Sequence, residues 1–217
     1  MPHFRTKVLR ELRGWDAWNV TEDIDLGLRL ARFGYRVEAL ASSTLEEAPA
    51  HLGLWMRQRR RWLKGWMQTA LVHARNPLRL VRDMGALEAT VAFLHVGGTL
   101  LGTLLGPFFA VLTLADVVWG DLLSPQTPLA LAASTCWCFV CLAGMAAGLW
   151  PLLLGMKRRG LWSCTLWLPT VPLYWTLQTV AAWWALYDLV RDPFHWHKTD
   201  HGMAKTRGGA ANLQQQP

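Results

Sequence analysis

Charged residues are scarce in this chain, and they almost vanish from its middle. Only 17% of the 217 residues are charged, whereas 52% are hydrophobic and 14 are tryptophans. Residues 86–187 are mostly apolar, while the first 85 residues and the short loop GMKRRG hold most of the Lys and Arg. This composition and charge asymmetry are typical of a membrane protein. The formal net charge of +7 makes phosphates or lipid headgroups the expected acidic partners.

Cysteine is also scarce, and it forms no metal-binding pattern. Cys136, Cys138 and Cys141 lie in one apolar run and Cys164 in another, with no His or second Cys pair at zinc spacing. We therefore expect no metal and no disulfide. The stretch MPHFRTKVLREL has no apolar core after its basic residues, so we expect no cleavable signal peptide and a cytosolic start.

The first 85 residues predict two helices and a strand. Thr21 can cap a helix with acidic residues in its first turn and apolar residues at helical spacing, which ends at Gly34. YRVEAL at 35–40 alternates apolar and polar residues, which predicts a strand with one buried face. A second helix is predicted from about Leu52 to Ala74, with Pro77 stopping it.

The apolar block predicts two membrane-crossing runs. Ala86–Trp119 would be about 51 Å long as one helix, against a hydrocarbon core of about 30 Å, so we expect a break at Gly106-Pro107. Leu129–Leu154 is of spanning length, and the basic residues after it favour a return to the cytosol. Leu161–Tyr187 is also long enough to span, but its prolines and the basic residues on both sides favour a broken segment that lies at the interface or re-enters the membrane.

The segment NVTEDIDLG allows two interpretations. Acidic side chains are favoured in the first turn of a helix by the helix dipole, which is a purely structural role. Alternatively, Asp23, held where a loop enters a helix, can act as a general base. A sugar hydroxyl that attacks an activated anomeric carbon must lose its proton, and a carboxylate within hydrogen-bond reach can take it.

The stretch QRRRW allows three interpretations. On a helix, Gln58, Arg61 and Trp62 share one face, while Arg59 and Arg60 point elsewhere. This face suits an interfacial helix, with arginine at anionic lipid and tryptophan at headgroup depth. It also suits a diphosphate and sugar site, because a guanidinium donates to two oxygens at once and an indole matches the apolar face of a sugar. Nucleic acid binding is disfavoured, because no wider basic surface appears.

Taken together, TED at 21–23 and QRRRW at 58–62, followed by membrane segments, resemble the membrane-bound family 2 glycosyltransferases, the processive, cellulose-synthase-like inverting enzymes. HFRTKVLRELRGWDAWNVTEDIDLGLRLARFGYR is similar to the acceptor half of their GT-A catalytic domain, and DPFHWHKTDHG to the WxKTxHG ending of a bacterial subgroup. The resemblance implies an α/β remnant of a GT-A domain with an interfacial helix over 1–85. Transmembrane and interfacial helices over 86–187 and a cytosolic tail over 188–217 would follow.

The resemblance also assigns roles to single residues. Asp23, with Glu22 beside it, matches the catalytic base of the TED motif. In the QxxRW motif, the arginine contacts the nucleotide diphosphate and the tryptophan lines the acceptor end of the site. The residues at substrate-binding positions are Thr21, Gln58, Arg61 and Trp62. The residues at the positions of a gating loop over the nucleotide are His195, Trp196, Lys198 and Thr199.

One part of the family pattern is missing from this sequence. Family members have an N-terminal half with a nucleotide-binding βαβ region and a DxD motif that holds a divalent cation, Mg or Mn. DID at 23–25 has that spacing but falls on the TED helix. Because the metal neutralises charge on the leaving diphosphate, we expect this chain to be nearly inactive alone. It would be the C-terminal half of an enzyme whose other half or partner subunit carries the metal ligands.

The sequence therefore predicts transfer of a sugar from a nucleotide-sugar, UDP-linked by expectation, to an acceptor hydroxyl with inversion. We expect a multi-pass protein of a bacterial inner membrane with cytosolic catalytic residues, making polysaccharide or glycolipid. Its expected partners are membrane lipids and an acceptor glycan or lipid, without nucleic acid. The alternative is a non-catalytic, membrane-anchored interaction protein or a degenerate remnant. A transporter is disfavoured, because the apolar runs carry almost no polar groups beyond His95 and Asp116.

Overall fold

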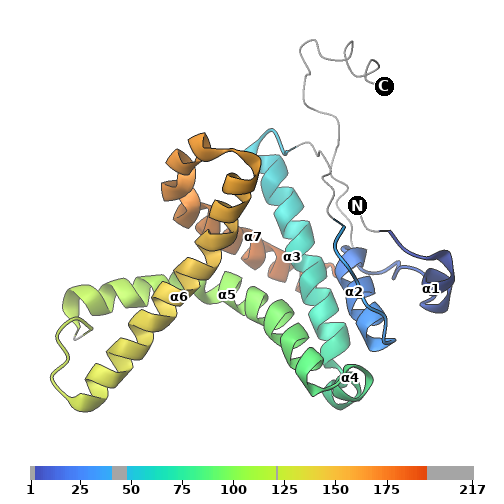
Figure 1. The fold of residues 1–217 in the computed structure, drawn as a ribbon, viewed down its shortest axis with the longest axis horizontal. Helices are drawn as coiled ribbons and strands as arrows, with labels where there is room; N and C mark the ends of the chain where they lie inside the picture. Colours follow the sequence, from blue (N-terminus) through green and yellow to red (C-terminus); the bar gives the residue numbers. More distant parts are fainter. Residues whose placement is uncertain (1–2, 41–47, 121, 195–217) are drawn as a thin grey trace, which may run out of the picture. The chain divides into compact units, whose positions relative to one another are not determined.

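A computed structural model describes residues 3–40, 48–120 and 122–194 of the chain, and these residues are mainly helical (Figure 1). Contacts divide the chain into two compact units, Met1–Gly102 with Val180–Pro217, and Thr103–Thr179. The domain boundaries expected at 85 and 187 stay predictions. The elements are α1 (Thr6–Glu11), α2 (Glu22–Arg32), α3 (Leu52–Ala74), α4 (Pro77–Met84), α5 (Ala86–Trp119), α6 (Pro128–Arg159), the 3-10 helix η1 (Trp162–Thr170) and α7 (Val171–Arg191).

The prediction of an α/β remnant of a GT-A domain is wrong, because no segment that the structure describes is a strand. YRVEAL at 35–40 has no regular secondary structure. Val37 and Leu40 are each 73% exposed, so the alternating pattern marks no buried face. A strand needs a neighbouring strand to satisfy its backbone N–H and C=O groups. The described residues provide no such neighbour to this segment.

The helix predicted after Thr21 is confirmed as α2. Gly34, at φ +77°, adopts the left-handed conformation that follows many helix ends. The apolar side of α2 packs into a small core with α1. The buried members of this core are Leu12, Leu26 and Leu30, and Phe4, Val8, Leu9 and Tyr35 pack around them.

The predicted second helix is confirmed as α3, with the same bounds, Leu52–Ala74. Helices α2, α3 and α4 pack against one another (Figure 1). A chain of polar side-chain contacts joins them: Asp25 Oδ1 lies 3.0 Å from His73 Nε2, His73 Nδ1 lies 3.3 Å from Arg32 Nη1, and Arg32 Nη2 lies 2.5 Å from Asp83 Oδ2. Burial by itself would raise the pKa of Asp25, but His73 and Arg29 outweigh it and hold this pKa below its ordinary value. The three helices are therefore joined by side-chain contacts among Asp25, His73, Arg32 and Asp83.

The second unit carries much of the apolar surface. By length and composition, α5 and α6 are the two helices among the described residues that can cross a membrane. The break expected at Gly106-Pro107 is wrong, because α5 stays helical through Pro107. Proline removes one backbone hydrogen bond, and a long helix can accommodate that loss. Within the unit, Trp137 Nε1 of α6 donates to Thr113 Oγ1 of α5 at 2.9 Å.

The third apolar run is broken, as its prolines predicted. Trp162–Thr170 form the 3-10 helix η1, which packs on α6, and α7 begins only at Val171. This run is not among the candidate spans of the described residues. Its position at a membrane interface stays a prediction.

Candidate functional site

The two sequence motifs meet where α3 passes the start of α2. A Cβ atom built on Gly65 would lie 1.6 Å from Thr21 Oγ1 and 2.8 Å from the backbone nitrogen of Thr21. Real Cβ atoms do not approach other atoms that closely, so only glycine fits here. Gly65 comes three residues after Trp62. TED and QRRRW are therefore in the same compact unit, and the backbone of α3 at Gly65 lies directly against Thr21, the first residue of TED.

Side chains of α3 also hold the loop that precedes α2. Asn19 is central, because its Nδ2 donates to α3 at 2.8 Å and its Oδ1 accepts from the backbone N–H of Thr21 at 3.0 Å. The backbone of Val20 is bound on both sides, its N–H donating to a side chain of α3 at 3.2 Å and its carbonyl accepting from another at 3.3 Å. The residues of α3 that make these bonds are Arg61, Gln68 and Thr69. The entry to α2 is thus fixed by helix α3.

The predicted catalytic carboxylates lie in the first turn of α2. Glu22 and Asp23 are both exposed, so their carboxylates can reach a substrate. Thr21 is the N-cap residue, but its hydroxyl makes no capping bond and is buried without a partner among the described residues. Asp25, in contrast, is buried and bonded to Arg29 and His73. Of the two aspartates in DID at 23–25, only Asp23 therefore has an accessible carboxylate.

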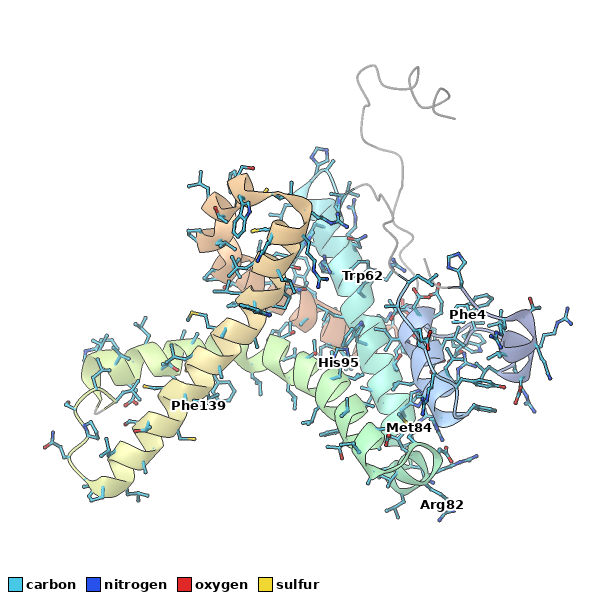
Figure 2. The ribbon with its side chains drawn as sticks, viewed as in Figure 1. Phe4, Trp62, Arg82, Met84, His95 and Phe139 are labelled. Carbon is cyan, nitrogen blue, oxygen red and sulfur yellow. The ribbon has the colours of Figure 1, made fainter. Side chains whose placement is uncertain are left out.

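The QRRRW residues lie in different environments. Arg61 Nη1 donates to the carbonyl of Val20 at 3.3 Å, while its Nε is buried without a partner among the described residues. Trp62 stands on α3 (Figure 2), and the guanidinium of Arg59 lies 4.6 Å from its ring centre and 5.4 Å from that of Trp55. The expectation that Arg59 points away from Trp62 is therefore wrong. Gln58 is half-buried one turn before Arg61.

Two further cations of α3 bind the end of α7, which the sequence did not predict. Arg60 forms an ion pair with Asp188, and its guanidinium lies 5.7 Å from the ring centre of Trp184. Lys64 Nζ donates to the carbonyl of Asp192 at 2.6 Å. Burial lowers the pKa of Lys64, and the nearby carboxylates only partly offset this effect. The four-residue spacing of Arg60 and Lys64 is visible in the sequence, but their partners, 128 residues further along the chain, are not.

The expected gating loop, Trp196, Lys198 and Thr199 with His195, lies outside the described residues. The last described residue is Phe194, whose ring packs edge-on against Trp18 at 5.5 Å between ring centres. The chain that leads to this segment thus starts beside the loop before α2.

No three His, Cys, Asp or Glu side chains gather at metal-binding distance in the part of the chain that the structure describes. The four cysteines are free thiols.

Comparison with known proteins identifies the class. The model of the family described as Glycosyl transferase family group 2 matches residues 2–190. The chain therefore belongs to this family of glycosyltransferases. A segment of 62 residues is 36% identical to "Probable glycosyltransferase YdaM" of Bacillus subtilis (strain 168), covering 28% of this chain and 15% of that relative. No solved structure matches the chain.

Proposed function

We propose that this chain is part of a membrane-bound, cellulose-synthase-like glycosyltransferase, which transfers a sugar from a nucleotide-sugar, such as a UDP-sugar, to an acceptor hydroxyl with inversion. The observation that carries the proposal is the contact of Gly65 with Thr21, because it places Asp23 and Arg61 on neighbouring elements. Membership of the family supplies the reaction class, glycosyl transfer. The product would be a polysaccharide or glycolipid.

In the proposed reaction, Asp23 accepts the proton of the acceptor hydroxyl. The hydroxyl oxygen then bonds to the anomeric carbon from the face opposite the nucleotide, while the bond from that carbon to the diphosphate oxygen breaks. An exposed carboxylate in the first turn of α2 suits this role, because substrate can reach it.

Arg61 would stabilise the negative charge that develops on the leaving diphosphate. Its guanidinium is anchored at one end by the carbonyl of Val20, so its orientation is fixed before substrate arrives. Preorganised cations of this kind lower the barrier because they need no rearrangement during the reaction. Trp62 and Gln58 would line the acceptor end, and Arg59 stacked on Trp62 would hold the indole in place.

The divalent cation expected for the whole enzyme does not fit the described residues, which provide no cluster of three ligating side chains. Asp25 is engaged by Arg29 and His73. The proposed steps therefore use only side chains of this chain.

The proposed location is a bacterial inner membrane, with the site on the cytosolic side. Two helices of spanning length and the basic residues at 157–159, which end α6, support this orientation. Membrane lipids and an acceptor glycan or lipid would be the partners.

The substitution Asp23→Asn tests the proposal in the native polypeptide that carries this chain, assayed in host membranes. We expect turnover to fall by at least about 100-fold, because the amide cannot accept the proton, while UDP binding is retained. Glu38→Gln, at an exposed position outside the site, is the matched control and should leave turnover unchanged. Turnover that survives Asp23→Asn would reject Asp23 as the base.

A further inference from the structure

The side-chain amide of Gln68 joins two segments that are far apart in the sequence. Its Oε1 accepts from the backbone N–H of Val20 at 3.2 Å, and its Nε2 donates to the carbonyl of Pro193 at 2.8 Å. The same Nε2 lies 3.5 Å from the carbonyl of Trp18. Gln68 is only 9% exposed, so water competes little for these bonds. One buried side chain therefore bridges the loop before α2 and the chain after α7.

This bridge is the last of three contacts along one side of α3. Arg60, Lys64 and Gln68 follow at intervals of four residues, and they bind Asp188, the carbonyl of Asp192 and the carbonyl of Pro193. The first two contacts join α3 to the end of α7. Gln68 also binds the loop that leads to TED, through the backbone N–H of Val20.

We infer that Gln68 is a positioning residue, which couples the loop leading to Asp23 to the chain that leaves α7. The same amide binds the carbonyl of Pro193 and the backbone N–H of Val20, two residues before Glu22. A movement of the chain at Pro193 would therefore displace Val20. The effect on catalysis rests on the proposed function, whereas the mechanical coupling does not.

The chemistry of the amide makes this role specific. An amide both donates and accepts, and the two partners fix which end does which, since Val20 offers an N–H and Pro193 a carbonyl. Gln68→Met keeps the shape of the side chain but loses both bonds. Gln68→Glu, when ionised, keeps the acceptor for Val20 and loses the donor for Pro193. When protonated, the same glutamic acid regains one donor.

The experiment measures the distance between the two segments directly. Spin labels are placed on cysteines introduced at Ala17 and Val190, which are both exposed, in the native polypeptide in lipid nanodiscs. The four native cysteines are replaced by alanine. We expect a narrow distance distribution for the parent, and a distribution that about doubles in width for Gln68→Met, because the bridge is lost. Gln126→Met, at an exposed glutamine of the second unit, is the control and should match the parent.

Gln68→Glu provides a pH-dependent readout, which a simple packing role would not give. Its distribution should be broad at neutral pH and narrow as the pH falls and the buried acid takes up a proton. Lys64, one turn away on α3, and Asp192 also carry charge near this position, so the parent is scanned over the same pH range. Two results would overturn the inference. One is a distance distribution for Gln68→Met as narrow as that of the parent, and the other is a distribution for Gln68→Glu whose width does not change with pH.

Kinetics on the same variants separate the inference from the proposed function. We expect Gln68→Met to lower kcat about tenfold or more, because a small misplacement of the base is costly, with little change in KM for the nucleotide-sugar. Should the parent transfer no sugar while the distances still respond, the proposed function fails and the coupling stands. Should the parent turn over normally while neither distances nor kcat respond to Gln68→Met, the coupling is wrong.

Discussion

Helices α3 and α6 are both long, but only α3 buries side chains, and polar and charged ones are among them. Four polar or charged residues of α3 are buried, and α6 buries no residue within its unit. Phe139 of α6 is 70% exposed (Figure 2). Buried polar groups are stable only with specific partners from elsewhere in the chain, whereas an exposed apolar helix is stable only out of water. The buried residues of α3 are Lys64, Gln68, Thr69 and His73.

This comparison shows how one chain can carry a candidate site and two helices long and apolar enough to cross a membrane. In the first unit, polar contacts specify the position of single side chains, as when Asn19 bonds to Thr69. The second unit also has a cross-helix polar contact, Trp137 with Thr113, but its apolar surface suits contact with lipid. Changes that break this division should therefore have very different effects in the two units.

The largest effect is expected from Gly65→Ala. Its methyl group would overlap the Thr21 hydroxyl and crowd the backbone of Thr21, so α3 or the start of α2 must move. We expect a loss of about 3–4 kcal/mol in unfolding free energy and at least about 100-fold in glycosyl transfer. The control is Gly53→Ala, at a position of the same helix with nothing within 4 Å of the added atom. Equal effects of the two substitutions, measured by denaturation and by turnover, would refute the close contact.

A somewhat smaller effect is expected from Asp25→Asn, which removes the charge that pairs with Arg29 and His73. Breaking a buried pair of this kind costs about 3 kcal/mol, which denaturant unfolding would measure. The pKa of Asp25 is held below the ordinary 3.8 in the folded state. Its stabilisation is therefore complete above that pH and is lost as the pH falls through the folded-state pKa. The variant should lack this acid-dependent loss, and an identical pH profile would contradict the pairing.

Phe139→Arg tests the other side of the comparison. If α6 lies in the membrane, a central arginine raises the free energy of insertion by about 2.5 kcal/mol or more, and the fraction of integrated protein falls. Resistance to alkaline extraction from membranes would measure this fraction. The matched control is Phe33→Arg, at an exposed phenylalanine of the first unit, which should leave integration unchanged. Full integration of Phe139→Arg would show that α6 is not surrounded by lipid.

The smallest effect is expected from Arg60→Ala, which removes the ion pair with Asp188. Because both side chains are partly exposed, the pair contributes only about 1 kcal/mol. A double-mutant cycle with Asp188→Ala isolates this contribution in thermal unfolding. A coupling energy near zero would show that the end of α7 is held by the other α3 contacts alone.

The sequence predicted the local parts of this structure well. The bounds of α3 and the existence of α2 follow from helical spacing and from Pro77, all of which act over a few residues. YRVEAL was wrongly predicted to be a strand. Alternating apolar and polar residues are typical of a strand with one buried face, but they do not provide the neighbouring strand that its backbone must pair with. The helix break predicted at Pro107 was wrong, because a proline weakens a helix without always ending it.

The site was predictable only in part. TED and QRRRW marked both segments, but their meeting depends on Gly65, whose role becomes visible only when the backbone of Thr21 lies against it. Arg60, Lys64 and Gln68 were equally hidden, since their partners come from the far end of the chain. Contacts across such long separations are set by tertiary packing, which no local pattern records.

The most direct test of the central claim is protection of the site by UDP. Native polypeptide in membranes is oxidised with hydroxyl radicals, with and without saturating UDP, and modified tryptophans are quantified by mass spectrometry. The account predicts that UDP protects Trp62, because the adjacent Arg61 would hold the diphosphate, while Trp150 and Trp162 of the second unit react equally in both samples. Unchanged oxidation of Trp62 would contradict a nucleotide site at QRRRW and favour arginines that serve only to hold lipid.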